Sequence, residues 1–173
     1  MNTLFRTPLK FGLMGTGVII LMFFVYQFTG SNPLIEMRIF DFFIIPIFLF
    51  FGIKDFRDAD NSGLMEFWQG MTAGFIIYGC IAVIYSAFLW LAVSLISPNM
   101  LEEYIAQSLK VLNENSEKLI GQMGQENFDT SYLDVGKTTT FDLVLDSLVK
   151  KAGIGFFLTS LIATVLKKKE KPS

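Results

Sequence analysis

The stretch Gly70 to Ser97, GMTAGFIIYGCIAVIYSAFLWLAVSLIS, contains twenty-eight residues and no formal charge. At about 1.5 Å of rise per residue, an α-helix of this length spans roughly 42 Å, more than the roughly 30 Å hydrocarbon core of a bilayer. A long core helix of a soluble protein would normally carry a polar stripe, and this stretch has none. Residues 70–97 are therefore predicted to form a membrane-spanning helix.

The composition of the whole chain agrees with a membrane protein. Hydrophobic residues make up 52% of the 173 residues, and nineteen residues are Phe. The chain has no His and a single Cys, Cys80, which excludes His-based catalytic or metal sites, an intrachain disulfide and a Cys-x-x-Cys motif. Phosphate-binding glycine loops and the common hydrolase motifs do not occur either. We therefore expect a protein that is not an enzyme and uses no cofactor or metal.

Three further apolar runs bring the predicted spans to four, within a single membrane domain of residues 1–173. The first covers about 10–28; a cleaved signal peptide is the alternative, but the run is longer than a usual signal core and no Ala-x-Ala follows. The second covers about 36–53, in a helix that starts at Pro33 after the capping residue Asn32. The last covers about 146–166. These segments predict an all-α, integral membrane four-helix bundle.

The segment of residues 98–140 lies between the third and fourth spans and is polar. Apolar residues at helical spacing predict an amphipathic helix from about Asn99 to Met123, followed by a loop over residues 121–140. The segment is acidic, so attachment to an anionic lipid surface is not expected. We expect the amphipathic helix to pack over the bundle or against a partner.

Charged residues at four-residue steps mark the start of the fourth helix, namely Asp142, Asp146 and Lys150. Ionisable residues inside a membrane often line ion or proton paths, and Arg38 with Asp41 could add to such a path. Helix length favours another interpretation: Lys150 lies about 24 Å of helix from Leu166. Lys150 and its neighbour Lys151 would then extend to the outer interface, with Asp146 and Lys150 forming an ordinary i,i+4 pair.

Small residues at four-residue spacing predict where two of the helices approach each other. They are Gly155, Thr159 and Ala163 in the fourth helix and Gly70 and Gly74 in the third. Small side chains let helix backbones come close in a membrane. We expect a packing surface within one bundle, and a seam between two copies is the alternative.

The basic residues predict the orientation of the spans. Arg6 and Lys10, Lys54 and Arg57, and the lysines from Lys167 onward fall on one side if four helices alternate. By the positive-inside rule this side is cytoplasmic and holds both termini, while residues 98–140 are extracytoplasmic. No folded basic surface with interleaved aromatic residues is expected outside the membrane, so nucleic-acid binding is not predicted.

A resemblance to a known family begins at residues 52–58, GIKDFRD. A polar turn containing Gly63 follows, and then Phe67-Trp68-Gln69-Gly70 leads into the third span. This arrangement resembles an uncharacterised family of small bacterial inner-membrane proteins, domain of unknown function 4199. The resemblance extends over nearly the whole chain, implies four transmembrane helices and supplies no activity, cofactor or catalytic residue.

From these features we expect a non-catalytic protein of the bacterial inner membrane. Its partners would be membrane lipids and either another membrane protein or further copies of itself. A structural or accessory subunit that acts by helix packing is the favoured function. The alternative is a small oligomeric transporter or channel that uses the charged residues at the outer end of the fourth helix.

Overall fold

The computed structural model describes residues 3–97 and 99–168, and this part of the chain is helical with no β-strand. The all-α prediction is therefore confirmed. An isolated antiparallel bridge joins Met65 to Lys168. The helical elements are α1 Thr3–Phe28, α2 Pro33–Glu36, α3 Arg38–Asp55, η1 Phe56–Asp60, α4 Phe67–Leu91, η2 Ala92–Ile96, α5 Asn99–Glu114, α6 Ser116–Met123, α7 Gln125–Gly136 and α8 Thr140–Leu166.

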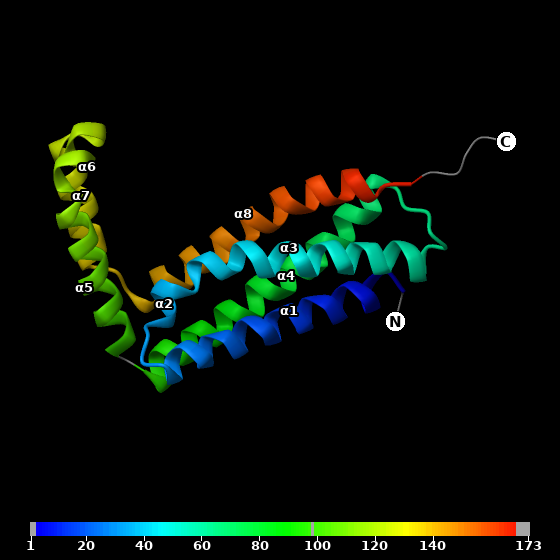
Figure 1. Ribbon diagram of the computed structural model, residues 1–173, viewed down its shortest axis with the longest axis horizontal. Helices are drawn as coiled ribbons and strands as arrows, with labels where there is room; N and C mark the ends of the chain where they lie inside the picture. The colour runs from blue at the N-terminus through cyan, green and yellow to red at the C-terminus, as the bar shows by residue number, and fades with distance from the viewer. Residues whose placement is uncertain (1–2, 98, 169–173) are drawn as a thin grey trace.

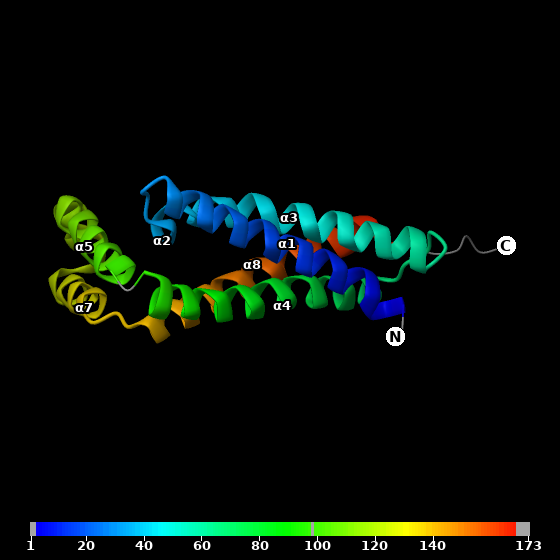
Figure 2. The same cartoon turned by 90° about the horizontal axis from the view of Figure 1, so that it is seen from below.

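Four long helices, α1, α3, α4 and α8, pack side by side along the longest dimension of the molecule (Figure 1). We call these four helices the helical body. In Figure 2, α3 and α4 lie on opposite sides of the body, and α1 and α8 run obliquely between the levels of these two helices. Helix α4 contacts the three others, and its contact with α8 is the most extensive. The uncharged stretch that decides the fold is thus the central helix of the body.

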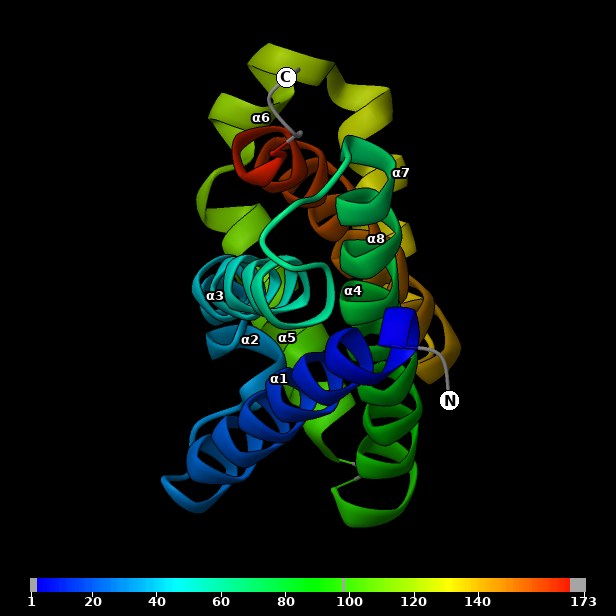
Figure 3. The same cartoon turned by 90° about the vertical axis from the view of Figure 1, so that its right-hand side faces the viewer.

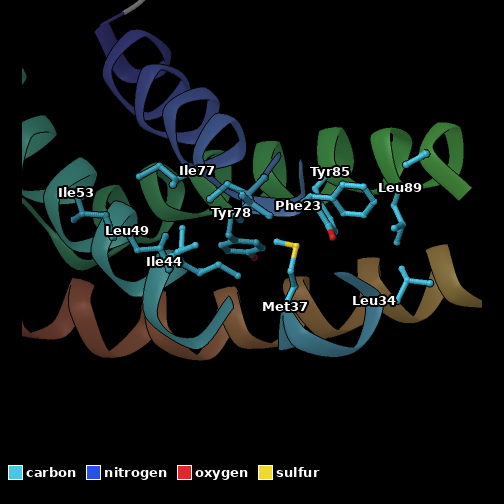
Figure 4. Packing of buried hydrophobic residues seen from close by; sticks show 14 of the residues in the cluster. Phe23, Leu34, Met37, Ile44, Leu49, Ile53, Ile77, Tyr78, Tyr85 and Leu89 are labelled. Atoms are coloured by element: carbon cyan, nitrogen blue, oxygen red, sulfur yellow. The ribbon is translucent and has the colours of Figure 1, made fainter. Parts of the chain in front are cut away.

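The interior of the helical body is almost entirely apolar. Ile45, Leu49 and Ile53 of α3, spaced by one helical turn, are fully buried, and so are Ile77 and Ile81 of α4. Figure 4 shows Leu49 and Ile53 on the side of α3 where Ile77 of α4 lies. Towards the α2 end the filling is aromatic, and the ring of Phe23 meets that of Phe88 edge to face at 5.0 Å. Among the described buried side chains, only Lys151 is charged.

The outer faces of the long helices are apolar as well. Leu21, Phe75, Val83, Phe157 and Val165 each expose more than 60% of their surface. Large contiguous apolar surfaces are unusual on soluble monomers. Three helices are long and apolar enough to cross a membrane: Phe5–Phe28, Phe67–Ile96 and Thr140–Leu166. Helix α3 is not among the three, since its eighteen residues include four charged ones.

The segment predicted as one helix from Pro33 is divided in two. Asn32 caps α2 as expected, with its Oδ1 accepting a hydrogen bond from the Leu34 amide at 3.0 Å. Helix α2 ends after a single turn, and α3 begins after Met37, which is buried. The short α2 places Leu34 and Met37 against α4 and α8 rather than in line with α3 (Figure 4).

The predicted structure of residues 98–140 needs two corrections. The helix expected from Asn99 to Met123 is interrupted at Asn115, and the expected loop over 121–140 contains a helix, α7. Gly124, with φ of 84°, reverses the chain between α6 and α7. The reversal lets α7 fold back along α5 and α6, where Phe128 is buried. This tertiary contact stabilises a helix whose own sequence has no clear apolar period.

Helices α5, α6 and α7 form an arm that stands across one end of the helical body (Figure 1). Three polar contacts hold its base: Asn32 Nδ2 donates to the Met100 carbonyl at 2.9 Å and to Glu103 Oε2 at 3.3 Å, and Gln27 Nε2 donates to Ser97 Oγ at 2.9 Å. Met100 is buried at the same place. The rest of the arm extends away from the four long helices.

The opposite end of the body is closed by the connection between α3 and α4, viewed end-on in Figure 3. Arg57 Nη1 donates to the Leu166 carbonyl at 3.3 Å, and Met65 and Lys168 exchange two backbone hydrogen bonds of 2.9 Å. Arg57 also pairs with Asp58 at 2.7 Å. This pairing raises the pKa of Arg57 and lowers the pKa of Asp58, the hydrogen bond between them being the main cause. The connection therefore satisfies one of the free carbonyls at the end of α8, that of Leu166.

Candidate functional site at the arm end of α8

The charged stripe of α8 begins with a helix cap. The carboxylate of Asp142 accepts hydrogen bonds from the Thr139 amide at 2.9 Å and from Thr139 Oγ1 at 2.6 Å. Thr139 Oγ1 in turn accepts from the Asp142 amide, which completes a capping box. Asp142 is thus engaged in starting the helix and points away from the interior of the body.

Asp146 and Lys150 form an ion pair one turn further along α8. Lys150 Nζ lies 2.6 Å from Asp146 Oδ2, and the two side chains are 59% and 47% exposed, respectively. The acidic residue precedes the basic one by four positions, which is the favourable order on a helix. A pair this exposed contributes about 0.3–0.5 kcal/mol to stability. The stripe of Asp142, Asp146 and Lys150 therefore follows the surface of the molecule.

Lys151 is the charged residue that the fold buries. Only 5% of its surface is exposed, although the sequence predicts that it extends to the outer interface like Lys150. Its ammonium lies 4.2 Å from the centre of the Tyr85 ring on α4, within range of a cation–π interaction, and 3.4 Å from Ser147 Oγ. The expectation of an exposed Lys151 is wrong because the lysine lies on the face of α8 that packs against α4.

A sequence signal for this burial exists. Lys151 precedes Gly155, Thr159 and Ala163 by steps of four residues, so it continues their row by one turn. The row faces α4 along its whole length, and Gly155, Thr159 and Ala163 are all buried. A residue that continues this row of small residues is expected to be buried between α8 and α4, even when it is a lysine.

The small residues of α4 and α8 face each other closely. A Cβ built on Gly74 would lie 2.2 Å from Thr159 Cγ2, and one on Gly70 would lie 2.9 Å from the Ala163 Cβ. Gly155 lies against the Tyr78 ring, with its Cβ position 2.4 Å from Tyr78 Cγ. The five residues singled out from the sequence thus lie in the contact between α4 and α8.

A cavity of about 70 Å³ opens next to Lys151. Its wall combines apolar side chains with a small number of hydroxyl and charged groups. The residues that line it are Pro33, Leu34, Met37, Tyr85, Leu89, Tyr104, Leu143, Asp146, Ser147, Lys150 and Lys151. They come from α2, α4, α5, α8 and the α2–α3 junction, so the site exists only in the folded protein.

In the described part of the chain, no group of three or more His, Cys, Asp or Glu residues that could hold a metal occurs. Cys80 is a free thiol in the middle of α4. The side chains of Arg38 and Asp41, and the lysines beyond Lys168, lie outside the described residues.

The described residues thus form helices, three of them long and apolar enough to cross a membrane, and this gives the chain the character of a membrane protein. The chain belongs to the family described as "Protein of unknown function (DUF4199)", which matches residues 10–168. No curated protein and no solved structure matches the chain.

Proposed function

We propose that the protein is a multi-pass protein of the bacterial inner membrane and a non-catalytic structural or accessory subunit of a membrane complex. In this proposal α3 is a fourth span, both termini are cytoplasmic and the α5–α7 arm is extracytoplasmic. The start of α1, the α3–α4 connection and the end of α8 lie at one end of the body, and the arm lies at the other (Figure 1). This alternation agrees with the distribution of basic residues.

The observation that carries the subunit proposal is the arm. It is attached at its base and leaves Val111, Met123 and Leu133 more than a third exposed. Residues 98–140 contain seven acidic and three basic residues, so the arm is also strongly charged. Exposed apolar groups suit the core of a contact with another protein, and acidic groups around them favour a partner of complementary charge.

Transport through the body has less support. A path for ions needs polar groups through the interior. The charged stripe of α8 is at the surface, and the large side chains of α1, α3 and α4 with 0% exposure are apolar, namely Ile19, Phe23, Ile45, Leu49, Ile53, Ile77 and Ile81. The buried polar or charged side chains among the described residues are four, Thr16, Ser86, Lys151 and Thr159.

The topology is tested with reporter proteins that are active only in the cytoplasm. We expect activity from fusions after Ser173 and at Ser62, which lies in the turn before α4, and none from a fusion at Gln125, the first residue of α7. Cytoplasmic activity at Gln125 would contradict the four-span proposal.

Partner contact is tested by crosslinking in living cells. A photoreactive residue at Leu133, which is 58% exposed on the arm, should form adducts with one or a few defined proteins. The control is Val83, which is 62% exposed in the middle of α4 and should react mainly with lipid. Adducts between two copies of this chain would make the complex a homo-oligomer. Equal patterns at both positions would contradict an arm that binds a partner.

A further inference from the structure

We propose that the α5–α7 arm is hinged at its base and that Asn32 is the latch that fixes its position on the helical body. By latch we mean the hydrogen bonds from the Asn32 side chain to α5. The arm is latched when these bonds are made and released when they are broken. This inference goes beyond the proposed function, because it concerns the chain alone and needs no partner.

The arm is joined to the body by two short connections. Ser97 lies between η2 and α5, and residues 137–139 lead from α7 to α8. Helices α6 and α7 make their main contacts with α5 and with each other, so the arm is one unit (Figure 1). At its base Met100 is buried and Leu101 packs against the core of the body. This apolar contact can serve as a pivot, because apolar packing has no preferred direction.

The side chain of Asn32 links the body to the arm. Its Nδ2 donates to the Met100 carbonyl at 2.9 Å and to Glu103 Oε2 at 3.3 Å, both on α5. Its Oδ1 accepts from the Leu34 amide at 3.0 Å on the side of the body. The orientation of the side-chain amide is fixed, since a backbone amide can only donate and a carbonyl can only accept. Asn32 therefore uses its oxygen for α2 and its nitrogen for the arm.

Asn32 is also the residue on which α2 depends. Its carbonyl accepts from the Ile35 amide at 3.1 Å and from the Glu36 amide at 3.3 Å, in addition to the side-chain cap. Helix α2 has four residues, too few to be stable alone. It places Leu34 and Met37 in the wall of a cavity between α2, α4, α5 and α8. A displacement of α5 that draws Asn32 along therefore reaches the interior of the body.

A second cavity gives the base of the arm room to move. It measures about 360 Å³ and lies between the α1–α2 connection and the α4–α5 junction. Gly30 and Asn32 line it from the body, and Asn99 and Glu103 line it from the arm. Because the described side chains leave this space open, the base can tilt towards the α1–α2 connection once the latch is released.

The latch is tested with Asn32→Asp in the purified full-length protein in mild detergent. Aspartate caps a helix as well as asparagine does, but it has no amide donor for α5 and places a carboxylate opposite Glu103. Pulsed electron paramagnetic resonance measures the distance between spin labels at Gln125 on the arm and Leu13 on α1, in a Cys80→Ala background. Both labelled positions are exposed.

We expect a narrow distance distribution in the parent and a broad one in Asn32→Asp. The ratio of released to latched arm should rise at least about tenfold, as expected for the loss of two hydrogen bonds. Hydrogen exchange of the amides of residues 34–36 should stay as slow as in the parent, since the cap is kept. Asn32→Ala should both release the arm and accelerate this exchange, because it loses both halves of the side-chain amide.

Two further variants separate the latch from a general effect of charge. Glu103→Lys combined with Asn32→Asp sets an ammonium opposite the new carboxylate and should narrow the distribution again. Gln122→Glu adds a carboxylate at an exposed position of the arm, far from the base in sequence, and should leave the distribution unchanged.

The proposal is overturned if the parent and Asn32→Asp give the same distance distribution, or if Gln122→Glu releases the arm to the same extent. It also fails if Asn32→Asp accelerates the exchange of residues 34–36 as much as Asn32→Ala does, because release would then follow from unfolding of α2. None of these outcomes bears on the crosslinking at Leu133, so the hinge and the subunit function fail separately.

Discussion

At the scale of single residues, the closest contact between α4 and α8 depends on the missing side chain of Gly74. A methyl group there would meet Thr159 Cγ2 at 2.2 Å. Gly79, on the same helix, has nothing within 4 Å of its Cβ position and is the matched control. We expect Gly74→Ala to destabilise the protein by about 1–3 kcal/mol through overpacking. Gly79→Ala should be neutral or stabilising by up to about 1 kcal/mol.

Thermal unfolding of both variants in detergent measures this difference. Gly155→Ala and Gly153→Ala make the same comparison on α8, because Gly155 lies against Tyr78 and Gly153 has open space at its Cβ position. If Gly74→Ala unfolds at the temperature of Gly79→Ala, the close approach of α4 and α8 does not exist in solution.

Ser86 gives a second prediction at the residue scale. Its hydroxyl is buried in α4 and makes no hydrogen bond within the described residues, whereas that of Ser160 on α8 donates to the Phe156 carbonyl at 3.0 Å. An unsatisfied buried hydroxyl costs free energy that Ala does not incur. We expect Ser86→Ala to be more stable than Ser160→Ala by about 1 kcal/mol, measured by thermal unfolding in detergent. Both changes gain the same helix propensity, so the reverse order would show that Ser86 has a partner in solution.

At the scale of elements, the α3–α4 connection holds the end of α8 through Arg57. The pKa of Asp58 is lowered by the hydrogen bond from Arg57, so the pair stabilises the folded protein above the ordinary carboxyl pKa of about 4. This contribution is lost as the pH falls through the lower pKa of the folded state.

The melting temperature of Asp58→Asn should therefore lie slightly below that of the parent at pH 7, and this difference should disappear towards pH 3. Arg57→Gln also loses the hydrogen bond to the Leu166 carbonyl, so the difference in melting temperature between this variant and the parent should become smaller at low pH without disappearing. A difference between Asp58→Asn and the parent that grows on acidification would contradict the role of the pair.

At the scale of the whole molecule, the subunit and transporter proposals differ in whether charge crosses the helical body. Purified protein in liposomes with a pH-sensitive dye inside should show no proton or cation flux under an imposed gradient. Asp146→Asn vesicles should behave like the parent, because the ion pair of Asp146 and Lys150 is at the surface. A flux in the parent that the variant abolishes would replace the accessory-subunit proposal with the transporter.

The amino-acid sequence by itself determined the features that depend on local runs of residues. A long uncharged stretch such as 70–97 forms a helix whatever its neighbours are, because a backbone in an apolar environment must satisfy its own hydrogen bonds. The all-α fold and the apolar helices could therefore be predicted, and the family was indicated by the resemblance that begins at residues 52–58. Small residues at four-residue spacing also pointed to the α4–α8 contact, because their positions depend only on helical geometry.

Only the tertiary structure decided the features that depend on contacts between distant segments. Helix α7 has no clear apolar period and forms where Gly124 turns it back onto α5 and α6. Lys151 is buried because the row it shares with Gly155 packs against α4, where Tyr85 receives its ammonium. A lysine can extend its ammonium to water or place it against an aromatic ring, and the two arrangements cost similar free energy locally. Which of the two occurs depends on the helix opposite, and this lies more than sixty residues away along the chain.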